Sequence, residues 1–280
     1  MPIDLYCVMG NPVQHSKSPW IHARFAELTG QTLQYGKRLI PLNGFATAVR
    51  AFIAEGGRGC NITVPFKFEA AALANRTSER AALAQAANLL SFTPHGIFAD
   101  NTDGAGLVND LQRNAGLDLS GRRLLLIGAG GAAAGVLGPL LQTHPASVTV
   151  ANRTLDKARA LVERHAALAL LQKTEILSSD LPGLTGDFDV VINASASSLG
   201  GAGVPVSART LRPGALAYDM MYGPAAQGFT TWAREHGAVA RDGLGMLVEQ
   251  AAEAFLIWRG VRPPSQQVLA ELQAELPCRT

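Results

Sequence analysis

The chain has 280 residues, with 24 lysines and arginines against 22 aspartates and glutamates, so its net charge is only +2. Hydrophobic residues make up 48% and charged residues 16%, a globular composition that excludes a disordered chain and suits about two domains. This charge balance excludes the basic surface that nucleic-acid binding needs, so we expect small-molecule partners and no nucleic acid.

The N-terminal half alternates strand and helix patterns, which predicts a largely parallel sheet. An apolar run at residues 5–10 predicts the first strand, and because no basic stretch precedes it, no signal peptide is expected. Ser18 is a predicted N-cap with Pro19 at the first helical position. A second strand is expected at residues 33–40, and Asn43 is the predicted cap of the helix after it.

The stretch CNITVPFK, residues 60–67, begins like a buried strand and ends on a lysine. Pro65 cannot donate a hydrogen bond to a sheet, so we expect the strand to stop there and a helix to follow over residues 68–75. Lys67 then lies at the junction, where it is either a solvated lysine in a first helical turn or a functional ammonium group. The glycosylation sequon at Asn61 is taken as a chance match in a protein without a signal peptide.

A hairpin over residues 87–92 and 96–103 follows, and Asp103 is the predicted N-cap of a connecting helix. A second alternation of strands and helices then begins. Its strands are expected near residues 123–127, 147–151, 189–193 and 216–220, and two final helices at 243–259 and 265–275.

Residues 124–141 carry no charge and nominally reach the length of a membrane span. They contain five glycines and Pro139, however, and divide into a strand and a helix. We therefore expect no membrane association.

The motif LLLIGAGGAAAG runs from a buried strand into a glycine-rich turn and a helix. Glycines there allow a tight turn and close approach of the backbone to a pyrophosphate, which the helix N-terminus attracts. The strand before it, the helix after it and a second strand at the expected distance favour a dinucleotide site over a glycine-rich helix that only packs closely. The residues expected to face the cofactor are Gly128, Ala129, Gly130, Gly131 and Ala132.

The end of the second strand indicates which nicotinamide cofactor binds. NAD sites place a carboxylate there, whereas NADP sites use an arginine for the 2′-phosphate. Here the chain offers Asn152, Arg153 and Thr154, with Lys157 one turn later, and Asp156 suits a helix-dipole role. This pattern predicts NADP.

Other polar residues stand at predicted strand ends, where ligands bind in open α/β sheets. Each alone has a structural explanation, as a turn, a cap or a satisfied amide, and only Lys67 resists one. Together they would suit a small polyhydroxylated acid. They are Ser16, Ser18, Thr63, Lys67, Asn88 and the run Asp100–Asp103.

Gln250 interrupts the apolar stripe of the helix predicted at 243–259. Burying an unpaired amide costs about 1–3 kcal/mol, so Gln250 needs either a partner in the core or a ligand. The cysteines, Cys7, Cys60 and Cys278, are odd in number and widely spaced, which suits neither a disulfide framework nor a metal site. A reducing compartment, the cytoplasm, is expected.

Taken in order, NPVQHSKSP, NITVPFK, DNTDG, GAGGAA, NRT, YDMMY and DGLGMLVEQA resemble the motifs of shikimate dehydrogenases, from about residue 7 to residue 260. The resemblance implies reversible, NADP-dependent reduction of 3-dehydroshikimate to shikimate in aromatic amino acid biosynthesis. It implies Lys67 and Asp103 as the catalytic pair. It implies substrate contacts at Ser16, Ser18, Thr63, Asn88, Tyr222 and Gln250, and cofactor contacts at Glu79, Met220, Gly243 and Met246.

The implied fold is α/β with two domains. A substrate domain at 1–104 plus 243–280, onto which the C-terminal helices pack, accompanies a Rossmann-type NADP-binding domain at 105–242. Departures from the family pattern are Leu89, Ser195-Ala196 and Gln227-Gly228. A relative with quinate or NAD preference and a non-catalytic NADP-binding sensor stay open as alternatives. The oligomeric state is not fixed, and a homodimer is carried as a hypothesis.

Overall fold

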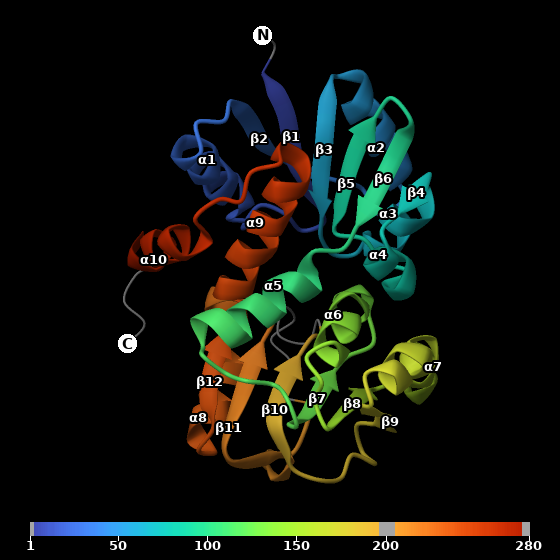
Figure 1. The fold of residues 1–280 in the computed structure, drawn as a ribbon, viewed down its shortest axis with the longest axis vertical. Coiled ribbons are helices and arrows are strands. Elements are labelled where there is room, and N and C mark those ends of the chain that lie inside the picture. Colours follow the sequence, from blue (N-terminus) through green and yellow to red (C-terminus); the bar gives the residue numbers. More distant parts are fainter. Residues whose placement is uncertain (1–2, 196–204, 276–280) are drawn as a thin grey trace. The chain divides into compact units, whose positions relative to one another are not determined.

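The computed structural model describes residues 3–195 and 205–275. The chain forms two compact units (Figure 1). The first runs up to Asp110 and resumes at Leu247, and the second is Leu111–Met246. Among the described residues, no helix is long and apolar enough to cross a membrane.

The first unit contains a six-stranded sheet in the order β2-β1-β3-β5-β6-β4. The pairs β1/β2, β1/β3 and β4/β6 are parallel, whereas the hairpin of β5 and β6 pairs antiparallel, also with β3. The strands are β1 (Asp4–Gly10), β2 (Leu33–Leu39), β3 (Gly57–Ile62), β4 (Arg76–Thr77), β5 (Leu89–Thr93) and β6 (Gly96–Asp100).

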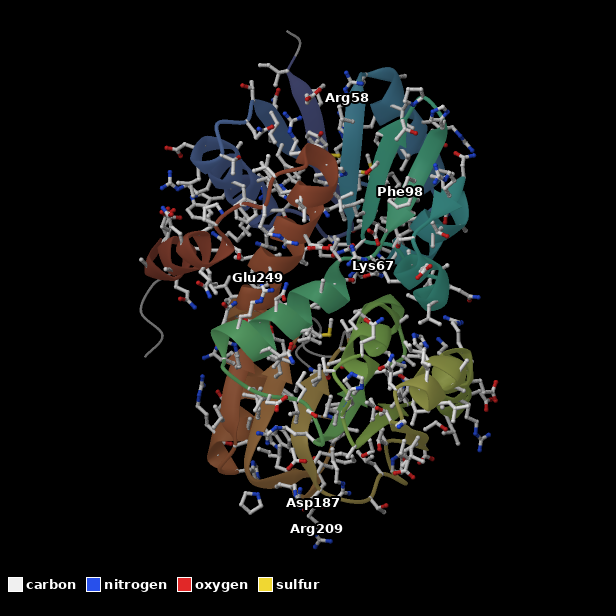
Figure 2. All side chains as sticks on the ribbon, in the orientation of Figure 1. Arg58, Lys67, Phe98, Asp187, Arg209 and Glu249 are labelled. Carbon is white, nitrogen blue, oxygen red and sulfur yellow. The ribbon has the colours of Figure 1, made fainter. Side chains whose placement is uncertain are left out.

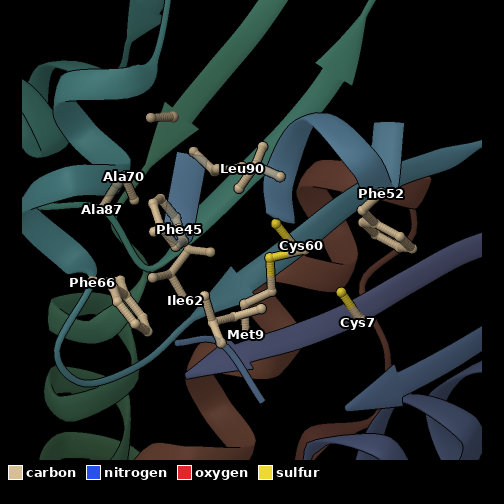
Figure 3. Packing of buried hydrophobic residues seen from close by; sticks show 13 residues of the cluster. Cys7, Met9, Phe45, Phe52, Cys60, Ile62, Phe66, Ala70, Ala87 and Leu90 are labelled. Carbon is tan, nitrogen blue, oxygen red and sulfur yellow. The ribbon is translucent and has the colours of Figure 1, made fainter. Parts of the chain in front are cut away.

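Helices cover both faces of this sheet because alternate side chains along each strand point to opposite faces. One face packs on α2 and α3 through a cluster that includes Cys7, Cys60, Phe45 and Phe66 (Figure 3). The other face packs on α1 and α9, where Tyr6 contacts the ring of Trp258, and α10 packs on α1. The helices are α1 (Ser18–Leu28), α2 (Phe45–Ala54), α3 (Lys67–Leu73), α4 (Glu79–Ala84), α5 (Asp103–Asn109), α9 (Leu244–Arg259) and α10 (Ser265–Glu275).

The C-terminal helices return to the first unit, as the sequence predicts. Arg24 on α1 binds Glu271 on α10 with two hydrogen bonds of 2.6 and 2.9 Å. The indole of Trp258 donates to the carbonyl of Leu90. Both contacts join chain segments that lie more than 160 residues apart.

The second unit is a six-stranded sheet whose described pairs are all parallel, in the order β12-β11-β10-β7-β8-β9. Counted from β7, this is the 3-2-1-4-5-6 order of dinucleotide-binding sheets. Its elements are β7 (Arg123–Ile127), α6 (Gly131–Leu141), β8 (Ser147–Asn152), α7 (Leu155–Leu171), β9 (Glu175–Asp180), β10 (Phe188–Asn193), β11 (Leu211–Asp219), α8 (Gln227–Glu235) and β12 (Val239–Asp242), with short helices at Asp110–Asn114, Ala208–Thr210 and Gly223–Ala226.

The three predicted side-chain caps are wrong. Lys17, Gly44 and Thr102 occupy the N-cap positions of α1, α2 and α5, and none of them caps through its side chain. Ser18 and Asp103 are instead the first helical residues, and their side chains bind elsewhere. The sequence also did not indicate α4, β4, β9 or β12, which are short or lack clear alternation.

His22 on α1 has no solvent exposure, and among the described residues neither ring nitrogen meets a partner at hydrogen-bond geometry. Its ring stacks on Tyr35 at 4.2 Å and lies near Phe255 and Trp258. Burial lowers the pKa of His22 to about 3. The histidine is therefore neutral in the folded protein.

This burial predicts a loss of stability in mild acid. Because the folded pKa is below the ordinary value of about 6.5, the contribution is complete above pH 6.5 and is lost as the pH falls towards 3. Between pH 6.5 and pH 5.0, the free energy of unfolding in urea should fall by about 2 kcal/mol more for the parent than for His22→Leu. The exposed His95, changed to Gln, serves as control. An equal loss in parent and His22→Leu would contradict the prediction.

Candidate active site

Lys67 lies at the carboxyl end of β3 in the first unit. The strand ends at Ile62, the turn through Pro65 follows, and Lys67 is the first residue of α3. Figure 2 places Lys67 at the end of the sheet where β3 and β6 finish. The side chain is 14% exposed, so it is not an ordinary solvated lysine.

Asp103 reaches Lys67 from the first position of α5, just after β6. Its Oδ2 accepts a hydrogen bond from Lys67 Nζ at 2.5 Å, and its side chain is 6% exposed. The two residues are 36 positions apart in sequence, and the antiparallel hairpin of β5 and β6 brings them together. An ion pair this buried needs further polar partners to offset desolvation.

Asn88 supplies those partners from the residue before β5. Its Nδ2 lies 2.8 Å from Asp103 Oδ1 and 2.9 Å from Thr102 Oγ1, while its Oδ1 accepts the backbone N–H of Thr102 at 2.8 Å. Asn88 is 2% exposed. It therefore fixes the loop and the carboxylate of Asp103 together.

Gln250 joins the same cluster from α9. Its Oε1 lies 3.2 Å from Asn88 Nδ2 and its Nε2 donates to the carbonyl of Leu247. The amide thus has the core partners that the sequence left as one alternative, and contact with a ligand stays a prediction.

The serine loop after β1 belongs to the same unit. Ser16 Oγ lies 3.1 Å from Ser18 Oγ and accepts the N–H of Ser18. Thr63 lies beside the end of β1, where its N–H donates to the carbonyl of Met9. A Cβ at Gly10 would come within 2.2 Å of Thr63 Cγ2, so only glycine lets the two segments approach this closely.

Asn61 and Tyr35 take part in a link that the sequence pattern did not reveal. Tyr35 donates its hydroxyl proton to Asn61 Oδ1 at 2.8 Å, and Asn61 Nδ2 donates to the carbonyl of Asn88 at 3.2 Å. In the sequence Asn61 stood out as a sequon and as a polar residue that interrupts an apolar run. That alternation was the available signal for a buried amide that needs partners.

The second unit carries the glycine turn between β7 and α6. Gly128 has φ +112°, and a Cβ there would lie 3.1 Å from the backbone of Ala194. Gly130 is the N-cap of α6 without a side-chain cap, and a Cβ there would meet nothing within 4 Å. The first N–H groups of α6, at Gly131 and Ala132, therefore border open space that suits an anionic group.

Arg153 follows β8 and is exposed. Within the described part of the chain it forms no ion pair. Asn152 Nδ2 donates to the carbonyl of Thr154, which shapes the turn, and Asp156 pairs with Arg159 at 3.5 Å. Arg153 and Lys157 therefore offer positive charge at the end of β8, as an NADP site needs.

The remaining expected cofactor residues fall in two places. Met220 follows β11 and is mostly buried, as is Met246 on α9, while a Cβ at Gly243 would meet the carbonyl oxygen of Met220 at 2.4 Å. Tyr222, an expected substrate contact, follows Met220 closely in the sequence and is half-buried. Glu79 belongs to the first unit, exposed at the start of α4.

The described residues that depart from the family pattern lie in both units. Leu89 is fully buried in β5. Ser195 donates its hydroxyl to Asn193 Oδ1 at 2.7 Å, and Gln227 begins α8. Ala196 lies outside the described residues, as does Cys278. Among the described residues, no group of three or more His, Cys, Asp or Glu side chains could hold a metal ion.

Comparison with known families gives three matches along the chain. Residues 8–90 match the shikimate dehydrogenase substrate binding domain, residues 110–200 match shikimate / quinate 5-dehydrogenase, and residues 243–273 match the shikimate 5′-dehydrogenase C-terminal domain. Together they cover both units.

Individual relatives match over nearly the whole chain. The shikimate dehydrogenase (NADP(+)) of Acidovorax sp. (strain JS42) is 68% identical, covering 98% of this chain and 97% of its own. The crystal structure of an Ael1 enzyme from Pseudomonas putida has a TM-score of 0.87 at 46% identity, and the match covers 98% of this chain and 99% of that one. Shikimate 5-dehydrogenase from Thermus thermophilus, in complex with NADP(H) and shikimate, has a TM-score of 0.84 at 28% identity, and the match covers 98% of this chain and 100% of that one.

The glycine turn, the parallel sheet order and the buried lysine–aspartate pair thus occur in a chain whose relatives share its full length. The chain belongs to the shikimate dehydrogenase family.

Proposed function

We propose that this protein catalyses the reversible, NADP-dependent reduction of 3-dehydroshikimate to shikimate, a step of aromatic amino acid biosynthesis. The hydrogen-bonded pair of Lys67 and Asp103, set among Asn88, Thr102 and Gln250, is the observation that carries the proposal. A cluster of amides, a hydroxyl, an ammonium and a carboxylate suits a ligand that carries several hydroxyl groups. Family membership supports the same reaction.

Lys67 is the proposed acid–base group. Reduction of a ketone leaves negative charge on its oxygen, which a neighbouring ammonium stabilises and protonates. Asp103 holds that ammonium through the 2.5 Å hydrogen bond and accepts a bond from a substrate hydroxyl. Ser16, Ser18, Thr63, Asn88, Tyr222 and Gln250 are the proposed contacts to the carboxylate and hydroxyls of the substrate.

The second unit fits a dinucleotide, because the open N-terminus of α6 follows a positive-φ glycine and the exposed Arg153 follows β8. Bound NADPH would supply the hydride. Gly128, Ala129, Gly130, Gly131 and Ala132 would hold the pyrophosphate, and Asn152, Arg153, Thr154 and Lys157 the 2′-phosphate. Glu79, Met220, Gly243 and Met246 are further proposed contacts.

Steady-state assays test this function and its nearest alternative together. Purified protein should form NADPH from shikimate and NADP, with kcat/KM at least about tenfold higher than for quinate with NADP or for shikimate with NAD. A buried polar mismatch with quinate costs about 1–3 kcal/mol, and NAD lacks the 2′-phosphate that Arg153 would bind. Dominant turnover of quinate with NAD would replace the proposal by a quinate dehydrogenase. Absence of shikimate-dependent NADPH formation would favour an NADP sensor.

The setting of the enzyme is also proposed. Cys7 and Cys60 are buried and form no disulfide, although they lie opposite each other on the paired strands β1 and β3. Free neighbouring thiols are typical of reducing compartments, so we place the protein in the cytoplasm. A homodimer is a second hypothesis, which sedimentation of the purified protein would test.

A further inference from the structure

Arg80 on α4 forms a two-pronged contact with the carboxylate of Asp100, at the end of β6. Arg80 Nε lies 2.7 Å from Asp100 Oδ1, and Nη2 lies 2.9 Å from Oδ2. Ser78 Oγ donates to the same Oδ1 at 2.5 Å. This fork fixes the plane of the carboxylate as well as its position.

The contact is mostly shielded from water. Asp100 is 7% exposed at its side chain and Arg80 is 29% exposed. Burial would raise the pKa of Asp100, but the hydrogen bonds from Arg80 and Ser78 outweigh it and hold the pKa below its ordinary value. Asp100 is therefore ionised at neutral pH and its orientation is set by Arg80.

Asp100 begins the loop that carries Asp103. Its Oδ1 accepts the N–H of Asn101 at 2.6 Å, and Asn101 Oδ1 in turn accepts the N–H of Asp103 at 3.1 Å. The carbonyl of Asp100 accepts the N–H of Asn88. Two consecutive hydrogen bonds thus connect the Arg80 fork to the backbone of Asp103.

A second arm of Arg80 reaches α9. Both Nη atoms lie 3.3 to 3.4 Å from Glu253 Oε1, and Arg262 holds the other oxygen of Glu253 at 2.6 Å. Glu253 is three positions after Gln250, so the two side chains lie on neighbouring positions of one helix face. One guanidinium thereby braces both segments that supply the site.

We propose that Arg80 is a positioning residue for the reaction, which orients Asp103, and through it Lys67, by clamping Asp100. The inference rests on the proposed function. Arg80 is not among the residues expected to touch substrate or cofactor, and Asp100 was expected there only as one member of the strand-end polar group. In the structure Ser78 caps α4 by accepting the N–H of Ala81, so it fixes the start of the helix that carries Arg80.

The test is Arg80→Lys, which keeps the charge and removes the fork. Arg24→Lys is the matched control, since Arg24 makes the same two-pronged contact with Glu271 in the same unit but far from the loop in sequence. Arg80→Lys should lower kcat for shikimate oxidation at least about tenfold, because small misplacements of catalytic groups cost that much. Arg24→Lys should leave kcat within about twofold while lowering the melting temperature comparably.

A double-mutant cycle separates positioning from general loosening. In an Asp103→Asn background, Arg80→Lys should change kcat by less than about twofold, because the group it orients is already altered. An equal fold-loss in both backgrounds, or a kcat within about twofold of the parent in the single variant, would overturn the proposal. If the parent itself forms no NADPH from shikimate, the proposed function fails, and shikimate affinity by calorimetry still reports whether Arg80 orders the cluster.

Discussion

Lys67→Ala should lower kcat for shikimate oxidation about 10²- to 10⁴-fold, the usual contribution of a positioned acid–base group. The substitution removes the ammonium that lies 2.5 Å from Asp103. The glycine turn and Arg153 belong to the other unit of the chain, so NADP affinity should stay within about twofold. Steady-state kinetics and calorimetric titration with NADP give the two quantities.

Asp103→Asn is the companion variant, because it keeps the size of the side chain and one oxygen for Asn88. If Lys67 and Asp103 act as a unit, the double variant should be about as slow as Lys67→Ala alone, as catalytic groups that act together are strongly non-additive. Thermal unfolding of each variant shows whether the loss comes from unfolding. A Lys67→Ala protein with kcat within a few-fold of the parent would remove Lys67 from the chemistry.

The sequence predicted the long, strongly patterned elements of the fold. Strand β7 is an apolar run after its first residue, and the predicted final helices match α9 and α10 within a residue. Short elements such as α4 and β12 escaped because six or four residues carry too little periodicity.

The side-chain partners were harder to predict than the elements. Ser18 and Asp103 are residue types that favour N-caps and stand at the start of predicted helices, so local rules predict that role. In the structure, the side chain of Ser18 is hydrogen-bonded to Ser16, and that of Asp103 is hydrogen-bonded to Lys67 and Asn88. The partners of Asp103 come from other segments of the chain, so a pattern of neighbouring residues cannot reveal them.

The same limit applies to Arg80. Its partners Asp100 and Glu253 are 20 and 173 positions away, and only the folded sheet and α9 bring the three together. Strand-end polar residues could be predicted as a group, because the carboxyl edge of a sheet is a known ligand site. No comparable sequence rule predicts a residue such as Arg80, which holds the strand-end residues in place.

Arg153→Ala should weaken binding of NADP about 10- to 100-fold and leave NAD nearly unchanged. A hydrogen bond to a charged group contributes about 1.5–3 kcal/mol, and only NADP carries the 2′-phosphate that such a bond would hold. Because Arg153 is exposed at the end of β8, the effect should shrink as salt screens the charge. Calorimetric dissociation constants for both dinucleotides, at low and high salt, measure it.

Arg159→Ala is the matched control, since Arg159 is an exposed arginine on α7, the helix that begins two residues after Arg153, and pairs with Asp156 at 3.5 Å. It should change neither affinity by more than about twofold, because exposed ion pairs contribute little. Equal weakening of NADP and NAD by Arg153→Ala would mean that Arg153 supports the turn rather than the phosphate. Lys157 would then be the next candidate for the 2′-phosphate, and Lys157→Ala should weaken NADP binding selectively, as Arg153→Ala would not.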